Sequence, residues 1–363
     1  MTDVLICGAG IAGSTLAYWL AHNGFTVTVV ERAPGVRSGG NPVDVRGPAL
    51  PVVEAMGVEA RLCDAATRAK RVRLLDKHGR AVATLGLPAA KGHEFEIPRS
   101  DLATVLYETA CKDADFLFDD TITGLSQDQH GVDVTFARAV SRRFDLVIGA
   151  DGVHSAVRRL VFGPEHDFVR PTGIYVATMS FGEAVDHPED VLLYNTPGRL
   201  AALHPSRDEG GVAFIFRATP DDIDIRDTAH HKRIVTEAYD GLGWRVPELL
   251  ARLRNADEVF FDAVSVVDLP SWSRGRIVLL GDAASCVSLL GEGSSLAIAG
   301  AYTLAGALAE AAIGGIRRYE TAHRAHVATQ RRPMKLVAAM LVPKTRQGLM
   351  VRNLAARLWP QSP

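Results

Sequence analysis

The residues with the clearest chemical meaning lie near the N-terminus, where Gly8, Gly10 and Gly13 separate an apolar run from a helix-like segment. Glycines at this spacing allow a tight turn, let a pyrophosphate reach backbone amides, and let the helix pack close to the strand. Such a helix N-terminus favours an anion through its free N–H groups and its dipole. Glu31 ends the second apolar run, where a carboxylate can accept hydrogen bonds from a ribose diol. The pattern predicts a dinucleotide site for either NAD or FAD, with the candidate residues Gly8, Gly10, Ile11, Ala12, Gly13, Glu31 and Arg32.

Two later strand-like runs also end in a glycine and an aspartate. Asp151 and Gly152 follow one buried run, and Gly281 and Asp282 follow another more than a hundred residues later. In open α/β sheets, ligands bind at the carboxyl ends of the strands. Together with the N-terminal glycine turn, these two strand ends imply one ligand long enough to touch all three.

The pattern of strand-like and helix-like segments around these residues predicts an α/β fold with more than one hydrophobic core. The chain has 363 residues, more than one small core usually organises. A strand, a glycine turn, a helix and a second strand fill the first thirty or so residues, as in a Rossmann-like unit. Between residues 172 and 261 the pattern changes to strand-like runs separated by turn signals. This region predicts an inserted antiparallel sheet that walls a substrate cavity.

One of these runs, over residues 212–217, alternates clearly. Alternation places Val212, Phe214 and Phe216 on one face of the strand. Phe214 and Phe216 either contribute to an aromatic substrate pocket or form core beneath the helix expected over residues 227–242. The pattern favours core without excluding the pocket.

A fourth candidate position precedes the helix-like segment that begins near residue 102. Arg99 stands just before it, and Ser100 or Asp101 is expected to cap its N-terminus. Leu102 completes an RxxL spacing with Arg99.

These motifs resemble those of the flavoprotein monooxygenases of the para-hydroxybenzoate hydroxylase type, which are single-component aromatic hydroxylases. That family carries the GxGxxG turn, a later Asp-Gly pair and a Gly-Asp pair in this order, with an RxxL arginine. The resemblance covers roughly residues 1–315. It implies FAD as the cofactor, with NADPH or NADH docking transiently in the cleft and no separate nicotinamide domain.

The resemblance also implies roles for individual residues. Arg99 would reach FAD from the pyrophosphate side, Asp282 would bond the ribityl region, and Asp151 is linked to both FAD and nicotinamide use. Arg46 falls where the family's chain passes close to the flavin ring, so we expect Arg46, Gly291 and Gly293 to act at the reacting end. The further cofactor-binding candidates are Arg46, Arg99, Asp151, Gly152, Gly281, Asp282, Gly293, Ser294 and Ser295, and the substrate candidates are Phe214, Phe216 and Leu289.

The resemblance also divides the chain. We expect a discontinuous FAD-binding domain made of residues 1–72, 97–170 and 262–320. The antiparallel substrate domain would consist of residues 73–96 and 171–261. Residues 321–363 would form a C-terminal helical segment.

The segment after Asp282 departs from the family. A helix expected over residues 294–312 would direct its N-terminus at the flavin, where its dipole favours the negative charge of the reduced ring. Ser285 stands where the family often has His, and Ser288 and Leu289 replace two prolines. The residues 291–295 (GEGSS) stand where the family often has GQGxN, in a segment that is one residue shorter. These differences face the region where oxygen would react, so they bear on oxygen activation more than on FAD binding.

Composition excludes several other classes. The net charge is −2, so general attraction to nucleic acid or anionic lipid is not encoded in the whole chain. No secretory signal is expected, and the four cysteines lack CxxC spacing, which indicates a reducing cytoplasm and no metal site. The basic, apolar segment from Arg331 to Pro363 is expected to pack as a terminal helix or helix pair across both domains, with a membrane-surface helix as the less favoured interpretation.

The resulting functional hypothesis is an FAD-dependent, NAD(P)H-consuming monooxygenase. Its flavin hydroperoxide would hydroxylate an aromatic or polyketide-like small molecule, with molecular oxygen as co-substrate. A flavin-dependent reductase or dehydrogenase of the same fold is one alternative, and a degenerate flavoprotein that only binds its ligand is another. A halogenase is disfavoured because WxWxIP is absent. The oligomeric state, the choice between NADH and NADPH, and the identity of the substrate stay open.

Overall fold

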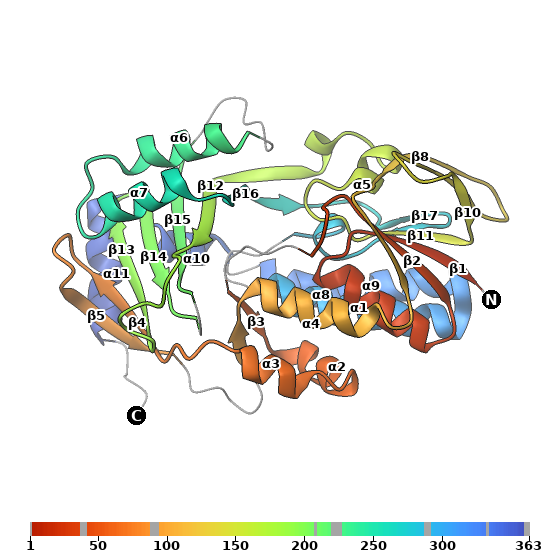
Figure 1. Cartoon of the computed structure of the whole chain (residues 1–363), viewed down its shortest axis with the longest axis horizontal. Coiled ribbons are helices and arrows are strands. Elements are labelled where there is room, and N and C mark those ends of the chain that lie inside the picture. Colours follow the sequence, from red (N-terminus) through yellow and green to blue (C-terminus); the bar gives the residue numbers. More distant parts are fainter. Residues whose placement is uncertain are drawn as a thin grey trace.

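The computed structural model describes residues 2–36, 42–87, 94–206, 209–218, 227–286, 292–331 and 334–358. Two large sheets, each with its own hydrophobic core, lie at opposite ends of an elongated molecule (Figure 1). The first described residues belong to the body built on the first sheet, and the last described helix, which ends at residue 358, lies beside the second sheet. The predicted α/β architecture with a Rossmann-like domain and a substrate domain is confirmed.

The first sheet has six strands, and five of them run parallel. Val4, Leu5 and Ile6 are fully buried in the central strand, because a parallel sheet is covered on both faces and its strands are continuously apolar. In spatial order the strands are β17 (Ser273–Arg274), β18 (Ile277–Leu279), β11 (Leu146–Gly149), β1 (Asp3–Cys7), β2 (Thr26–Glu31) and β7 (Asp115–Phe118).

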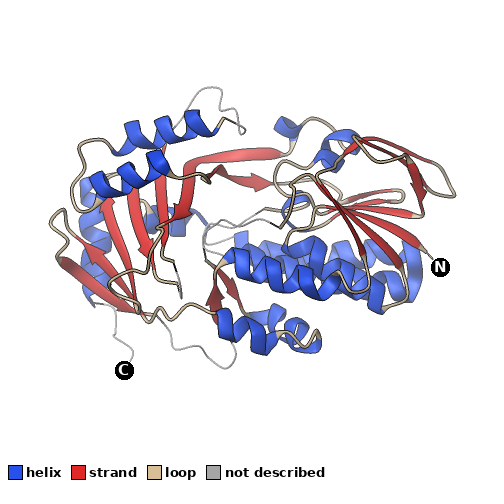
Figure 2. Ribbon diagram, in the orientation of Figure 1, coloured by secondary structure: helices blue, strands red, loops and turns tan. Residues whose placement is uncertain are grey.

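Layers of helix and strand cover the two faces of this sheet. On one face α1 packs against α4 and α8, and α9 packs against α8. On the other face lie α5 and a three-stranded sheet, as the ribbon shows (Figure 2). These elements are α1 (Ile11–His22), α4 (Arg99–Ala110), α5 (Ala156–Val161), α8 (Glu292–Ala311), α9 (Ile316–Arg331), β8 (Ile122–Gln127), β9 (Val132–Phe136) and β10 (Arg142–Phe144).

The run Gly293–Thr329, which spans α8 and α9, is long and apolar enough to cross a membrane, and 56% of its most apolar window is buried inside the protein. Ile298, Leu304 and Leu308 on α8 belong to the first core. A core helix of a water-soluble protein has the same properties.

The second sheet has seven strands, and all but the β13–β4 pair are antiparallel. Pro197 and Gly198 form the tight hairpin between β13 and β14, as the sequence predicts. Helices α6 (Thr228–Tyr239) and α7 (Val246–Asn255) cover one face. The spatial order is β16 (Phe260–Val267), β12 (Val169–Ser180), β15 (Gly211–Arg217), β14 (Arg199–His204), β13 (Asp190–Thr196), β4 (Arg71–Leu75) and β5 (Ala81–Gly86).

The last two helices cover the opposite face of the second sheet. They are α10 (Met334–Leu341) and α11 (Arg346–Leu358). Val342 packs against Ile174, Leu200 and Ile215. Within the described residues the chain thus ends in helices, and α9 runs continuously through residue 321, where the C-terminal segment was expected to begin.

Smaller elements and two long strands join the bodies. Strands β12 and β16 extend from the second sheet to the first body, with an irregular register between Pro171 and Tyr175 (Figure 2). Below them β3 (Val43–Val45) pairs with β6 (Phe95–Ile97). The short helices α2 (Leu50–Ala55) and α3 (Glu59–Ala65) both follow β3 in the chain. Short 3-10 turns complete the chain: η1 (Gly47–Ala49), η2 (Glu165–Asp167), η3 (Gly281–Ala283) and η4 (Ala312–Gly315).

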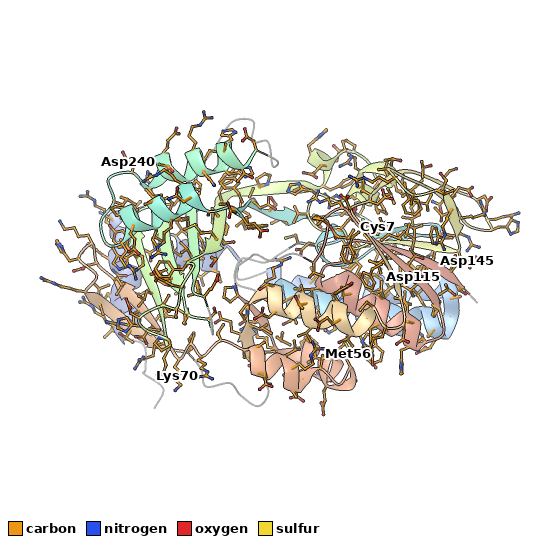
Figure 3. The ribbon with its side chains drawn as sticks, in the orientation of Figure 1. Cys7, Met56, Lys70, Asp115, Asp145 and Asp240 are labelled. Carbon is orange, nitrogen blue, oxygen red and sulfur yellow. The ribbon has the colours of Figure 1, made fainter. Side chains whose placement is uncertain are left out.

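The carboxyl ends of the parallel strands face the second body. Cys7, the last residue of β1, lies nearer to the second sheet than Asp115 and Asp145, which stand at the starts of their strands (Figure 3). The residues that follow β1, β2, β11 and β18 therefore meet between the two bodies, as ligand-binding residues do in open α/β sheets.

Gly13 determines how closely α1 packs against the turn after β1. A Cβ built at Gly13 would lie 1.9 Å from the carbonyl oxygen of Gly8, which is backbone and cannot move aside. We expect Gly13→Ala to lower the free energy of unfolding by about 2 kcal/mol or more. Urea denaturation measures this loss.

Gly306→Ala is the matched control, because Gly306 also lies in a helix and its added Cβ would meet no atom within 4 Å. That variant should keep or slightly gain stability. Equal stability losses in the two variants would contradict the steric explanation.

Candidate functional site

A cavity of about 1030 Å³ lies where the strand ends of the first sheet meet the second sheet. Its first side carries the glycine turn and the Asp151 turn, and its second side carries Tyr175 and Phe261 from β12 and β16. A larger groove of about 1780 Å³ continues from it and shares several lining residues with it. Both spaces are lined by Arg32, Arg99, Asp151, Gly152, His154, Phe261 and Asp262.

The glycine turn has the shape that a dinucleotide requires. Gly8 has φ +107, and its added Cβ would meet the carbonyl oxygen of Ala150 at 2.5 Å, so only glycine fits between β1 and β11. Gly10 differs, because its added Cβ would meet nothing within 4 Å. No side chain caps the N-terminus of α1 there. The space beside Gly10 therefore suits a pyrophosphate that binds the first amides of the helix.

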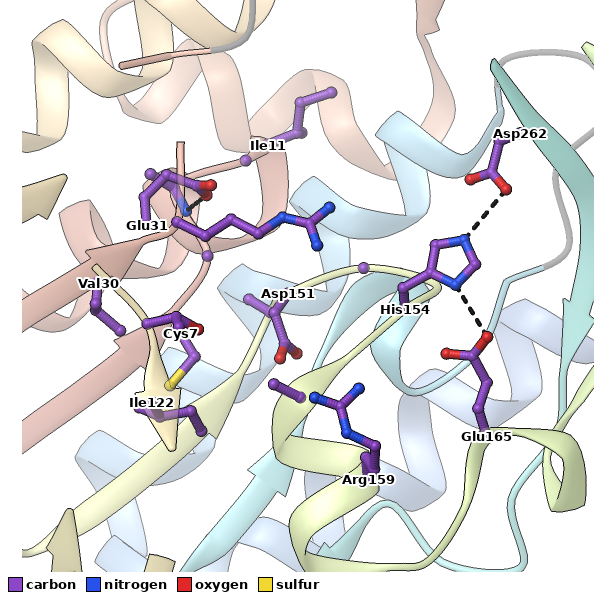
Figure 4. A pocket seen from close by; sticks show the side chains of 18 of the residues that line it. Cys7, Ile11, Val30, Glu31, Ile122, Asp151, His154, Arg159, Glu165 and Asp262 are labelled. Carbon is purple, nitrogen blue, oxygen red and sulfur yellow. Dashed lines mark hydrogen bonds and ion pairs between the residues drawn. The ribbon is translucent and has the colours of Figure 1, made fainter. Parts of the chain in front are cut away.

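Glu31 is held at the end of β2 by backbone amides. Its Oε2 accepts a hydrogen bond from Ala9 N at 2.9 Å, and its Oε1 accepts one from Ala33 N at 2.9 Å. The carboxylate lines the cavity with Asp151 and Arg159 (Figure 4). Each carboxylate oxygen can accept more than one hydrogen bond, so Glu31 retains the capacity to bind a ribose diol.

Asp151 organises the turn that follows β11. Its carboxylate accepts hydrogen bonds from the Ser155 hydroxyl and, at 3.1 Å, from Val157 N at the start of α5. Burial raises the pKa of Asp151. Gly152 has φ +79 and an unobstructed Cβ direction, so this turn also leaves room for a ligand. The carboxylate is thus already used to shape the turn.

Asp282 and Arg99 face the larger groove from two different elements. Asp282 lies in η3 after β18, and Arg99 is the first residue of α4. Burial raises the pKa of Asp282, and the positive charge of Arg99 acts in the opposite direction. The expected cap by Ser100 or Asp101 is wrong, because α4 begins earlier, at Arg99, with Pro98 at the cap position and no side-chain cap bond.

The candidates Arg46, Ser294 and Ser295 come together where β3 meets α8. The hydroxyls of Ser294 and Ser295 both donate to the carbonyl oxygen of Asp44, at 2.6 and 2.9 Å. Ser295 Oγ also accepts from Arg46 N at 3.1 Å, and the Arg46 guanidinium lies 3.3 Å from the Asp44 carboxylate. The first turn of α8, with Gly293, is thereby fastened to β3. Gly291 and Leu289 lie outside the described residues.

The substrate assignment of Phe214 and Phe216 is corrected, because neither lines the cavity or the groove. Both are buried against Tyr239 of α6, with ring centroids 4.9 and 5.8 Å apart. The predicted alternation of side chains on β15 is correct, and of the two interpretations of these phenylalanines the structure supports the core beneath α6. The aromatic side chains that reach the cavity are Tyr175 and Phe261, which lie beside Phe216 on the neighbouring strands β12 and β16 of the same sheet.

Arg158 is a site residue that sequence reasoning missed. Its side chain is fully buried, and it donates to the carbonyl oxygens of Val153 and, at 3.1 Å, Ala283. Its guanidinium also lies 3.6 Å from the Glu165 carboxylate. Arg158 therefore joins the Asp151 turn to the Asp282 turn. An arginine three residues after Ser155, which caps α5, was visible in the sequence, but nothing there indicated its burial.

His154 is the second residue that was missed. Its Nδ1 lies 2.9 Å from Glu165 Oε1, and its Nε2 lies 3.2 Å from Asp262 Oδ1 (Figure 4). These two carboxylates raise the pKa of His154 to about 9. Since Asp262 belongs to β16, the imidazolium connects the first body to the second at the mouth of the cavity.

Comparison with known proteins agrees with this geometry. Residues 1–338 match the FAD binding domain family. The chain is 40% identical over 316 residues to the uncharacterized protein MT1298 of Mycobacterium tuberculosis (strain CDC 1551 / Oshkosh), with 85% of each chain covered. It is 36% identical to a flavin-dependent monooxygenase from an unknown prokaryotic organism, covering 84% of this chain and 80% of the relative.

A solved structure, that of tetracycline destructase Tet(55), superposes with a TM-score of 0.85 at 32% identity, covering 98% of this chain and 95% of that one. The chain belongs to the FAD binding domain family and is an FAD-dependent monooxygenase. The predicted family, enzyme class and cofactor are confirmed, while the roles of individual residues remain predictions.

Gly10→Ala separates FAD binding from folding. The backbone of Gly10, with φ −76, is accessible to alanine, and the added methyl meets no protein atom. The free energy of unfolding of the flavin-free protein should therefore stay unchanged. The FAD dissociation constant should rise about tenfold or more, because the methyl occupies the place of the pyrophosphate. Calorimetric titration with FAD measures the change.

Gly306→Ala serves again as the control and should bind FAD like the parent protein. Normal FAD affinity in the Gly10→Ala variant would show that the pyrophosphate does not approach this turn.

His154 makes stability depend on pH. Its pKa in the folded protein is about 9, above the ordinary value of 6.5. The stabilisation is complete below pH 6.5 and is lost as the pH rises through 9, with a total of up to about 3 kcal/mol. Urea denaturation between pH 6 and 10 should show this decline in the parent protein and a flatter profile in His154→Gln.

His166→Gln is the matched control, because His166 is an exposed histidine on the neighbouring turn. Its profile should follow that of the parent protein. A flat profile in the parent protein would mean that His154 carries no such charge.

Proposed function

We propose that this enzyme uses NADH or NADPH and molecular oxygen to hydroxylate an aromatic or polyketide-like small molecule. The observation that carries the proposal is the cavity between the two bodies, which has dinucleotide-binding turns on one side and aromatic side chains on the other. A planar, unsaturated ligand suits such a wall. The name of the solved relative, tetracycline destructase, supports a polyketide-like compound.

The chain's own residues would supply binding and orientation. The N-terminus of α1 and the space at Gly10 would take the pyrophosphate, and Glu31 would bind the adenosine ribose. Arg99 and Asp282 would hold the middle of the cofactor from opposite elements. Bound FAD supplies electron transfer from the nicotinamide to oxygen.

The start of α8 would act at the reacting end. Because Ser294 and Ser295 fasten this helix to Asp44, its N-terminus is held in one position. The positive end of the α8 dipole, held in a fixed position, would favour negative charge on a reduced flavin ring. Arg46 is held at the same junction through its backbone amide, which supports its predicted position near the ring.

The wall formed by β12 and β16 would orient the substrate and exclude water. Tyr175 and Phe261 are mostly buried and lie with their rings 5.9 Å apart and nearly parallel. Exclusion of water at this wall would limit wasteful reduction of oxygen to hydrogen peroxide.

Purified holoenzyme should oxidise NADPH or NADH faster when a suitable phenol or polyketide is present. Mass spectrometry after reaction under ¹⁸O₂ should show one ¹⁸O atom in the product. Product without ¹⁸O would identify a reductase or dehydrogenase instead. A ligand that binds with no change in NAD(P)H oxidation would favour the ligand-binding alternative.

The aromatic wall is tested by Tyr175→Ala and Phe261→Ala. Each should lower kcat/KM for the product-forming reaction about tenfold and raise the hydrogen peroxide yield, because a ring contact with the substrate is lost. Tyr302→Ala is the control, since Tyr302 is an exposed aromatic residue on α8 that packs against Trp19. Unchanged kinetics in both wall variants would place the substrate elsewhere.

A further inference from the structure

The outer surface of α10 and α11 is apolar, although it faces solvent. Met350, Val351, Leu354 and Leu358 lie on the outer side of α11 and are 58–76% exposed. Leu336 and Met340 extend this surface onto α10. Of the ten exposed large hydrophobic side chains in the described part of the chain, these six lie between residues 336 and 358. We call this set the outer face of α10–α11.

The polar contacts of these helices are on the side that faces the protein. Arg352 donates to the Asn195 side-chain oxygen at 3.0 Å, and Arg217 from β15 donates to the carbonyl oxygens of Val342 and Ala338. Apolar side chains pack on this inner side too, among them Ala338, Leu341 and Ala356. These helices are thus apolar on both sides, whereas a helix on the surface of a water-soluble protein normally exposes a polar side. The outer face is therefore suited to contact with another apolar surface outside the protein.

The charge of this region selects the kind of partner. From residue 331 to residue 363 the chain has no Asp or Glu, but it has seven cationic residues, namely Arg331, Arg332, Lys335, Lys344, Arg346, Arg352 and Arg357. Since the whole chain has a net charge of −2, the other residues are strongly acidic. Lys344 and Arg346 are exposed beside the outer face, and Arg357, which is also exposed, donates to the carbonyl oxygen of Val82 at 2.7 Å.

A second copy of the chain fits this surface poorly, because two outer faces would bring two cationic segments together. An anionic lipid surface fits both features. Its headgroups attract the cations, and its acyl boundary accepts the apolar side chains of a helix that lies in the membrane plane. This combination also departs from the expectation that the basic tail serves intramolecular packing alone.

We propose that the outer face of α10–α11 docks the enzyme on the surface of an anionic membrane. The helices lie parallel to the bilayer, with Met350, Leu354 and Leu358 in the interfacial region. Lys344 and Arg346 lie at the level of the headgroups. The second sheet keeps its contacts with the inner side of both helices, so docking needs no unfolding.

Vesicle flotation of the full-length holoenzyme tests the proposal. Vesicles of phosphatidylcholine with 30% phosphatidylglycerol should carry the protein at 0.1 M NaCl, and vesicles of phosphatidylcholine alone should bind it at least tenfold more weakly. The triple variant Met350→Ser, Val351→Ser, Leu354→Ser should lose at least tenfold of the binding. Binding of the parent protein should weaken as NaCl is raised to 0.5 M. The double variant Lys344→Gln, Arg346→Gln should bind more weakly than the parent protein and should lose this salt dependence.

The controls are Val140→Ser, an exposed apolar residue far from these helices, and Lys112→Gln, an exposed cation on the first body. Both should bind like the parent protein, and all variants should keep the FAD absorption spectrum and the thermal midpoint of the parent. Parent protein that fails to float with anionic vesicles would overturn the proposal. The proposal would also be overturned if sedimentation velocity showed the parent protein as a dimer and the triple variant as a monomer. The outer face would then be an interface between two copies of the chain.

Discussion

The buried guanidinium of Arg158 is the interaction on which the arrangement of the site depends. A cation without solvent exposure is costly unless charge and hydrogen-bond acceptors surround it. Arg158 has the Glu165 carboxylate at 3.6 Å and the carbonyl oxygens of Val153 and Ala283. Because these carbonyls belong to two different turns, the arginine fixes the end of β11 relative to the end of β18. The two turns must keep this spacing to bind one elongated cofactor.

The same carboxylate continues the connection into the second body. Glu165 contacts Arg158 with one oxygen and His154 with the other, and His154 contacts Asp262 on β16. These four alternating charges run from the interior of the first body to the strand that carries Phe261. The width of the cavity between the dinucleotide turns and the aromatic wall is therefore set by an ion-pair chain as well as by the long strands β12 and β16.

The sequence predicted those parts of the site that local backbone chemistry dictates. Gly8 and Gly13 could be recognised because a tight turn and a close helix contact leave no room for a side chain. The ion-pair chain could not be predicted, because Glu165 and Asp262 meet His154 only after three separate elements pack. The same holds for Phe214 and Phe216. Alternation correctly predicted that both lie on one face of β15, but only the packing of α6 shows that this face is part of the core.

The terminal helices pack on the second body, and this links the surface of the molecule to its cavity. Ile215 lines the larger groove and also packs in the cluster that contains Val342, so one side chain separates the end of α10 from the groove. Arg217, the next outward-facing residue on the same side of β15, holds two carbonyl oxygens at the end of α10. A partner that binds the outer face of α10–α11 would thus press on the sheet that walls the cavity. An apolar substrate that partitions into a membrane would meet the enzyme at the body that carries the aromatic side of the cavity.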